Sequence, residues 1–300
     1  MTETSVAAPA QTSIYRAALW MMGWLAAISV MTVSGRELSA ELNTFQIMFV
    51  RSVVSLALTI AMWQLVGRPS LRTRRLPLHL FRNVVHFGAQ AFWFLGIALL
   101  PIAQVISIEF TAPMWTALLA AMFLGERLTR WRVLAIALGF GGILLIVRPG
   151  LGSVDPATLV VLAAAIGFGV TLTITKDLSR TDSALTIIFI MHLTQLPLGL
   201  IPSLADWTTP SPALWPWVLA VGIGGFFSHY CVARALACAD ATVVTPLDFL
   251  RLPLMALVGW WLYQEGVDAF LAAGAALIVL GNFMNVRNER ASERLAAPPA

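Results

Sequence analysis

Charged residues are scarce in this 300-residue sequence: Asp, Glu, Lys and Arg make up 11% of it, whereas 59% of the residues are hydrophobic. Soluble domains carry roughly a quarter charged residues, so this composition excludes an ordinary soluble fold. Cysteine is also rare, and both cysteines, Cys231 and Cys238, fall in or at the end of one apolar stretch. Their spacing matches no metal site, and we interpret them as small apolar side chains rather than a disulfide.

Other absences narrow the function. No phosphate-binding Gly-Lys-Ser/Thr loop occurs, so ATP-driven pumping is unsupported. We find neither a His/Cys cluster for a metal nor a nucleophile–base set, and we predict no cofactor and no enzyme activity. Glu3 and the missing cleavage site argue against a signal peptide, so we expect a retained first helix. The net charge of +4 comes from basic residues in short loops, which argues against a nucleic-acid partner.

Long apolar runs are what the sequence has in abundance. Each is close to the length of roughly 20 residues that crosses the hydrocarbon core of a bilayer. Their continuity, without period-two alternation, predicts helices rather than barrel strands. The predicted spans are 15–34, 45–66, 80–99, 103–124, 130–147, 157–175, 184–204, 213–235, 240–263 and 268–286.

The ten spans form two copies of one unit. A shift of about 140 residues aligns Arg36-Glu37-Leu38-Ser39 with Lys176-Asp177-Leu178-Ser179, and Pro113 with Pro253. Because each copy has five spans, the second must enter the membrane upside down. We therefore predict an all-α membrane protein with ten transmembrane helices as a 5+5 inverted-topology repeat. Its parts would be a disordered tail (1–14), repeat 1 (15–150), repeat 2 (151–287) and a second disordered tail (288–300).

The basic residues test this topology independently. With the N-terminus inside, fourteen basic residues of the loops and tails face inward, and only Arg36 and Arg148 face outward. This is a strong positive-inside bias. It predicts cytoplasmic N- and C-termini, in the bacterial inner membrane if the chain is bacterial. Two halves in opposite orientations can exchange conformations and open one site to each face in turn, which favours a carrier over a gated channel, an embedded enzyme or a structural subunit.

Several segments resemble the EamA module of the drug/metabolite transporter superfamily. They are Ile97-Ala98-Leu99-Leu100-Pro101, Phe110-Thr111-Ala112-Pro113, Leu124-Gly125-Glu126-Arg127-Leu128 and, in the second copy, Ala235-Leu236, Pro253 and Gln264-Glu265. The resemblance covers nearly all of residues 15–287. It implies a central cavity lined mainly by helices 1, 3, 4, 6, 8 and 9, with helices 5 and 10 at the periphery. Members of the superfamily include amino acid exporters and uptake systems for riboflavin or S-adenosylmethionine. Arg51 also matches the family, but Met191 stands opposite it, so the two halves are not chemically equivalent.

Charges within the spans are functional candidates, because burying a charge in a bilayer is unfavourable. Arg51 and Glu109 lie about 9 Å from the outer ends of their spans, and this equal depth permits an ion pair. The pair could form a strut between helices, or Arg51 could reach outward to the membrane surface instead. In the functional alternative, Glu109 is a proton-titrated gate or a ligand for a substrate amine. Asp248 and Arg251, three residues apart, share a helix face as a neutralising pair or as a substrate or proton site.

Prolines accompany these charges. Pro113, Pro246 and Pro253 each remove a helical hydrogen bond from the carbonyl four residues earlier. We expect helices 4 and 9 to be bent, either as plain kinks or as gating elements around a cavity.

Polar and aromatic residues complete the predicted substrate site. His86, Gln90 and Trp93 form one stripe on helix 3, and helix 8 offers His229 and Tyr230. Such a stripe faces the interior of the bundle, for packing or for ligand contact. The three tryptophans Trp24, Trp93 and Trp115 lie within the spans and either fill the core or stack on a flat solute.

The predicted function is transport of a small amphipathic metabolite by alternating access, as a facilitator or coupled to protons. Deep aromatics beside both signs of charge fit a zwitterion with an apolar side chain. Amino acid export, including aromatic amino acids, is therefore the leading expectation, and uptake of riboflavin or S-adenosylmethionine is the alternative. The expected partners are the solute and the lipid bilayer. Both a monomer and a homodimer fit the sequence, because the glycines of helices 5 and 10 favour close helix packing.

Overall fold

The computed structural model describes residues 14–124, 130–148, 155–238 and 247–296, and these ranges contain helices and no strands. The first half comprises α1 (Ile14–Leu38), α2 (Thr44–Leu65), α3 (Leu76–Leu99), α4 (Ile102–Glu109), α5 (Ala112–Leu124) and α6 (Arg130–Val147). The second comprises α7 (Pro156–Leu178), α8 (Ala184–Ser203), α9 (Trp215–Cys238), α11 (Arg251–Tyr263) and α12 (Ala269–Ala296), with short 3-10 turns at Leu204–Asp206 and Pro212–Leu214. Taken in chain order, the described helices account for the ten predicted spans, the fourth being divided into α4 and α5.

The helix ends follow from local sequence. Asn43 caps α2 by accepting a hydrogen bond from the amide of Gln46, and Ser183 caps α8 by accepting one from the amide of Thr186. These two caps align under the repeat shift, so the second helix of each half starts in the same way. Asp155 caps α7 directly before a proline in the first turn.

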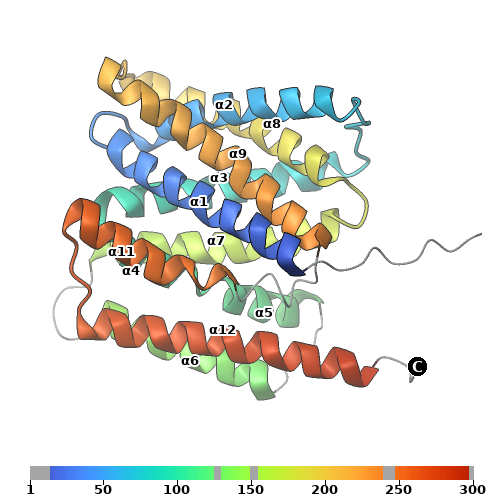
Figure 1. Ribbon diagram of the computed structural model, residues 1–300, viewed down its shortest axis with the longest axis vertical. Coiled ribbons are helices and arrows are strands. Elements are labelled where there is room, and N and C mark those ends of the chain that lie inside the picture. Colours follow the sequence, from blue (N-terminus) through green and yellow to red (C-terminus); the bar gives the residue numbers. More distant parts are fainter. Residues whose placement is uncertain (1–13, 125–129, 149–154, 239–246, 297–300) are drawn as a thin grey trace, which may run out of the picture.

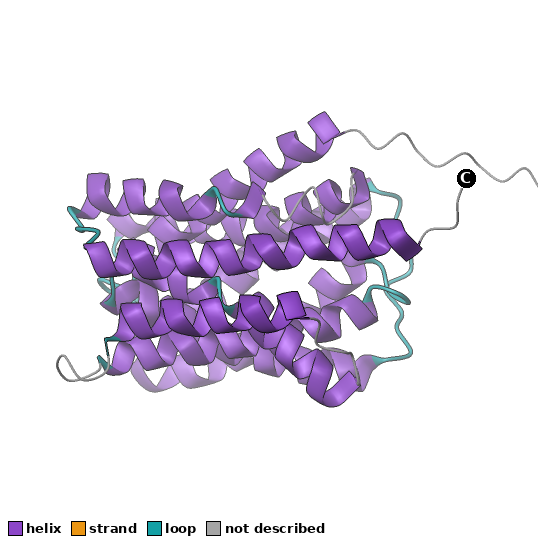
Figure 2. Ribbon diagram, turned by 90° about the horizontal axis from the view of Figure 1, so that it is seen from below, coloured by secondary structure: helices purple, strands orange, loops and turns teal. Residues whose placement is uncertain are grey.

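The packing of the helices shows the internal symmetry. The most extensive contacts between helices pair α1 with α9, α3 with α7, α2 with α8 and α6 with α12. Exchanging the two halves converts the α1–α9 pair into the α7–α3 pair and maps the other two pairs onto themselves. The fold is therefore the predicted 5+5 inverted repeat. Figure 1 shows α6 and α12 together at the lower edge of the bundle, and in Figure 2 the loops gather at its two ends.

The outer surface of the bundle suits a bilayer. Among the described residues, six segments are long and apolar enough to cross a membrane, and shorter apolar helices cover Val133–Val147 and Ala269–Met284. Large apolar side chains point outward along the bundle, among them Leu19, Leu144, Ile201 and Leu257. The start of α1 and the end of α12 lie at the right-hand end of the bundle in Figure 1. The basic loop between α2 and α3 lies at that same end, as the charge distribution predicts.

Two expectations need correction. The predicted fourth span is not one helix, since Phe110 and Thr111 interrupt it. The tail predicted from residue 288 is helical as far as Ala296, because its Ala, Glu and Arg residues favour helix. The glycines of helices 5 and 10 allow the close helix packing that the sequence predicts, here between these two helices of one chain. A Cβ at Gly142 would lie 2.5 Å from the carbonyl oxygen of Gly274, so only glycine allows this approach.

Candidate functional site

Three charged side chains meet where the interrupted helices α4 and α11 approach each other. Arg251 Nη1 donates a 2.8 Å hydrogen bond to Glu109 Oε1, and Arg251 Nε lies 3.4 Å from Asp248 Oδ1. Trp93 Nε1 donates a 2.7 Å hydrogen bond to the other carboxylate oxygen of Glu109. The three charged side chains are 5% (Arg251), 18% (Glu109) and 31% (Asp248) exposed, so the guanidinium is the deepest of them.

Aromatic rings enclose the guanidinium. Arg251 Cζ lies 5.4 Å from the ring centroid of Trp24 and 4.8 Å from that of Phe110, both within range of a cation–π interaction. Five residues predicted from the sequence thus come together, and we call them the charged cluster: Trp24, Trp93, Glu109, Asp248 and Arg251. Phe110 was not predicted as a site residue, although its place beside Glu109 and three residues before Pro113 in a membrane span was a usable signal.

Breaks in the helices position this cluster. Glu109 is the last residue of α4, and Arg251 is the first residue of α11. Asn282 of α12 donates a 2.7 Å hydrogen bond to the carbonyl oxygen of Phe110, which lies in the break between α4 and α5. Asn282 is the first polar side chain after the apolar run that begins α12 at Ala269, and this signal for a buried contact was not used in the sequence analysis.

The helix breaks lie close to the prolines, as the sequence predicts. Pro113 follows the break between α4 and α5, and Pro253 lies in the first turn of α11. Both are exposed on the outside of the bundle, so they shape the backbone without lining the charged cluster. Pro246 lies outside the described residues.

The predicted pairing of Arg51 with Glu109 is wrong. Arg51 Nη2 instead donates hydrogen bonds to Gln90 Oε1 (2.8 Å) and Gln195 Oε1 (2.6 Å), and the arginine is completely buried. Equal depth did not bring the two charges together, because the side chains of two helices meet only if they also face the same way around their axes.

The remaining residues predicted for the substrate site lie in two other parts of the bundle. The ring of His86 lies 6.1 Å from that of His229 and 5.8 Å from that of Phe168 on α7, in the interior of the bundle. Tyr230 stacks on Phe226, with ring centroids 5.8 Å apart, and is not joined to the charged cluster by any described contact.

Trp115 also departs from the expectation. Its ring packs edge-on against Phe140 of α6 at 5.2 Å, and its indole N–H donates to Thr111 Oγ1. These contacts place Trp115 outside the charged cluster.

A cavity of about 430 Å³ lies between α4, α11 and α12. Helix 10 of the repeat, here α12, contributes to it, although the resemblance placed this helix at the periphery. Its lining is apolar and includes the exposed residues Pro253, Val267 and Ala272. The cavity therefore opens at the apolar side of the bundle rather than into the charged cluster.

At the predicted outer end, a mostly buried ion pair joins the two halves. Arg36 of α1 forms an ion pair with Glu265 and donates to the carbonyl oxygens of Ile97 and Leu100. Glu265 also accepts a 2.7 Å hydrogen bond from the amide of Ile102, the first residue of α4. We call Arg36 with Glu265 the outer ion pair.

Local backbone geometry directs Glu265 inward. The preceding residue, Gln264, ends α11 in a left-handed conformation with φ 54° and turns the chain back. A Cβ at Gly259 would lie 2.5 Å from Glu265 Oε2, so glycine leaves the room that the carboxylate occupies.

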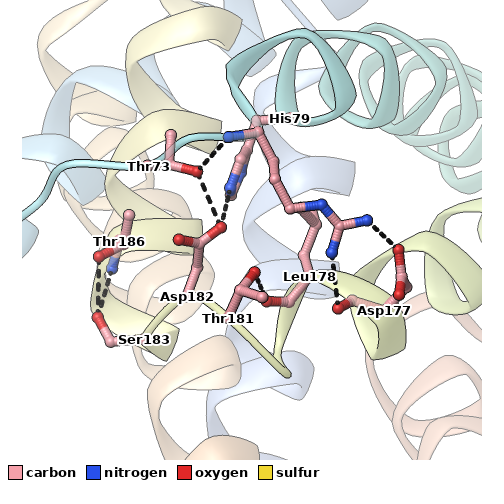
Figure 3. A network of polar contacts seen from close by, with 9 residues as sticks. Thr73, His79, Asp177, Leu178, Thr181, Asp182, Ser183 and Thr186 are labelled. Carbon is pink, nitrogen blue, oxygen red and sulfur yellow. Dashed lines mark hydrogen bonds and ion pairs between the residues drawn. The ribbon is translucent and has the colours of Figure 1, made fainter.

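At the predicted inner end, a polar network joins the loop between α2 and α3 with the loop between α7 and α8 (Figure 3). His79 Nε2 and Thr73 Oγ1 each lie 2.9 Å from Asp182 Oδ2. Arg75 forms an ion pair with Asp177. We call these five residues the inner network.

The charge state of Asp182 follows from these contacts. Burial by itself would raise the pKa of the Asp182 carboxyl, but hydrogen bonds from His79 and Thr73 and the nearby charges of His79 and Arg75 hold it below its ordinary value. Asp182 is therefore ionised over the physiological range of pH.

An all-α membrane bundle with two inverted repeats and a charged cluster buried between them defines a transport protein of the inverted-repeat class. The model of the EamA-like transporter family matches residues 15–148 and 156–287. The chain belongs to this family, and the match covers both repeats.

Curated relatives are similar over most of their length. A riboflavin transporter of Rhizobium johnstonii is 31% identical over 99% of both chains. An S-adenosylmethionine uptake transporter of Rickettsia prowazekii is 24% identical over 91% of this chain and 93% of the relative. A pseudopaline exporter of Pseudomonas aeruginosa is 30% identical over 84% of this chain and 89% of the relative. A solved crystal structure with a TM-score of 0.66 and 20% identity, which covers 96% of this chain and 100% of that chain, matches the fold.

Proposed function

We propose that this transporter carries a small amphipathic metabolite in which a flat ring is joined to a polar or charged group. The observation that carries the proposal is the charged cluster, in which Trp24 and Phe110 flank Arg251 while Glu109 and Asp248 offer carboxylates. Aromatic faces stack on flat rings, and a few polar groups fix the orientation of a bound ligand.

The relatives reported above support this ordering of substrates. They are named for riboflavin, S-adenosylmethionine and pseudopaline. We therefore place flat-ring metabolites first and amino acids, the leading expectation from the sequence, second. The presence of both charge signs in the cluster keeps amino acids in the test.

The transport cycle we propose is alternating access. The outer ion pair and the inner network each join residues of opposite halves, so one set of contacts must separate each time a face opens. The bacterial inner membrane with cytoplasmic termini is the proposed location, from the distribution of basic residues.

The cycle is driven by the gradient of the solute or by protons. Asp248 supports proton coupling, because at membrane depth its Oδ1 makes no hydrogen bond and contacts Arg251 Nε at 3.4 Å. In the coupled case, uptake rises with an imposed proton gradient and Asp248→Asn removes that rise.

The first experiment is uptake into proteoliposomes of radiolabelled riboflavin, S-adenosylmethionine and a panel of amino acids, with and without a proton gradient. We expect saturable uptake of at least one flat-ring solute above that of every amino acid. If only amino acids are carried, the order of substrates reverses, and if no solute saturates, the carrier proposal itself is wrong.

Two matched tryptophan variants test the position of the site. Trp93→Phe keeps an aromatic ring but removes the N–H that donates to Glu109, and uptake should fall by about tenfold or more, since hydrogen bonds to charged groups are the stronger ones. Trp115→Phe loses a comparable N–H outside the charged cluster and should stay within about twofold of the parent. Equal effects of the two variants would place the site elsewhere.

A further inference from the structure

A second group of polar side chains lies buried in the bundle, apart from the charged cluster. Its centre is Arg51 of α2, which is 0% exposed. Only Nη2 of its guanidinium is occupied, by the side-chain oxygens of Gln90 and Gln195. Nε and Nη1 are buried without a hydrogen-bond partner.

Imidazoles surround this arginine. Both ring nitrogens of His86 on α3 and of His192 on α8 are likewise buried without a hydrogen-bond partner. Arg51, His192 and His229 all lie close enough to His86 to interact with it electrostatically. We call Arg51, His86 and His192 the basic cluster. With two nitrogens from each, it has six unsatisfied nitrogen atoms in the membrane interior.

The charge balance of the two clusters differs. In the charged cluster Arg251 is paired with Glu109 and Asp248, which leaves one negative charge in excess. In the part of the chain that the structure describes, neither Arg51 nor Arg82, the buried arginine that also acts on His86 and His192, forms an ion pair, which leaves positive charge in excess. A buried cation with free N–H donors is strongly unfavourable unless an anion pairs with it.

A metal ion does not satisfy this cluster. Among the described residues no group of three or more His, Cys, Asp or Glu side chains has the arrangement to hold one. The guanidinium of Arg51 would also repel a cation. The chemistry of the cluster, N–H donors around a fixed positive charge, matches an oxyanion.

One helix connects the two clusters. His86, Gln90 and Trp93 follow each other along the same face of α3, where Gln90 contacts Arg51 and Trp93 contacts Glu109. From His86 to Trp93 the helix rises by about 10 Å. The two clusters are therefore separated by about the length of a small solute.

We propose that the basic cluster binds a carboxylate of the transported solute while the charged cluster holds its cationic end and ring. This inference deepens the proposed function and rests on it. According to this inference, the transporter prefers flat-ring metabolites that carry both a carboxylate and an ammonium group, as amino acids do, to neutral flat-ring metabolites. Arg51 has no counterpart in the second half, where Met191 stands opposite it, so the carboxylate end always lies on the side of α2.

The test compares uptake of S-adenosylmethionine with that of its decarboxylated analogue, which differs only in lacking the carboxylate. We expect the parent protein to prefer S-adenosylmethionine by about tenfold or more, as hydrogen bonds to charged groups imply. Arg51→Gln should abolish this preference by lowering uptake of S-adenosylmethionine while leaving the analogue unchanged. Arg82→Gln is the matched control, because Arg82 also carries a buried positive charge that acts on His86, but its guanidinium already donates to Thr175 and Asn83. It should keep the preference.

The outcomes separate the two proposals. If Arg51→Gln lowers both solutes equally, or if the parent shows no preference, Arg51 is a strut between helices and the inference is wrong. If Arg51→Gln does not fold in detergent, His192→Asn decides by the same ratio, since its ring nitrogens make no hydrogen bond whose loss would unfold the protein. Uptake of riboflavin without S-adenosylmethionine would overturn the inference and leave the proposed function standing, whereas uptake of no flat-ring solute would overturn the proposed function.

Discussion

The two ends of this transporter are closed by different kinds of contact. The outer ion pair is mostly buried, with 19% of Arg36 and 11% of Glu265 exposed, and it reaches backbone groups of α3 and α4. The inner network combines one exposed ion pair, 31% and 47% for Arg75 and Asp177, with a buried histidine–carboxylate contact. Burial rather than the number of charges should therefore decide which contact stabilises the closed state more.

The largest effect is expected at the outer end. Glu265→Gln leaves the partly buried guanidinium of Arg36 without its counterion, and we expect a loss of about 1–3 kcal/mol in the free energy of unfolding. The outer face should also open more often. Thermal melting in detergent measures the first effect. Labelling by a membrane-impermeant thiol reagent measures the second, with a cysteine in place of Trp24 and both native cysteines replaced by alanine.

The control for this variant is at the same end. Arg148 and Asp268 also form an ion pair between the halves, but they are 33% and 56% exposed. Asp268→Asn should therefore change neither the melting temperature nor the labelling measurably. If Asp268→Asn matches Glu265→Gln, net charge at the outer end matters and burial does not.

A smaller effect is expected at the inner end. Asp182→Ala removes the acceptor that faces His79 Nε2, and the side chain of His79 is 0% exposed. A buried donor left without a partner is unfavourable by about 1–3 kcal/mol, and the loss should lie at the lower end of this range because a loop can adjust. Arg75→Gln, which removes the exposed pair of the same network, should have little effect. Melting curves of the two variants compare these contributions, and a larger change in Arg75→Gln would contradict the role of burial.

The sequence was sufficient for the fold because the fold depends on features that are repeated or continuous. Apolar runs defined the spans, and the aligned starts of α2 and α8, at Asn43 and Ser183, reflect the internal repeat. The odd number of spans in each copy then predicted the opposite orientation of the halves, and the charge in the loops tested it independently. None of these signals requires knowledge of which side chains touch.

The sites could be predicted only in part, because contacts between helices depend on rotation about the helix axis as well as on depth. The sequence named Arg251 and Glu109 but paired Glu109 with Arg51 instead. The glutamines that do contact Arg51, Gln90 and Gln195, lie on two other helices. Glu265 was named as part of a segment that resembles the family, but its inward direction depends on the left-handed turn at Gln264.

The smallest expected effect is a pH dependence that distinguishes the carboxylate of the inner network from its histidine. The contacts of Asp182 lower its pKa in the folded protein below the value of about 3.9 in an unfolded chain. A carboxyl group with a lowered pKa contributes stability above its unfolded pKa and loses it as the pH falls through the folded value. The difference in melting temperature between the parent and Asp182→Asn should therefore be constant from about pH 5 to 8 and shrink below about pH 4. A change centred near pH 6.5, where imidazoles ordinarily titrate, would instead assign the pH dependence of the inner end to a histidine.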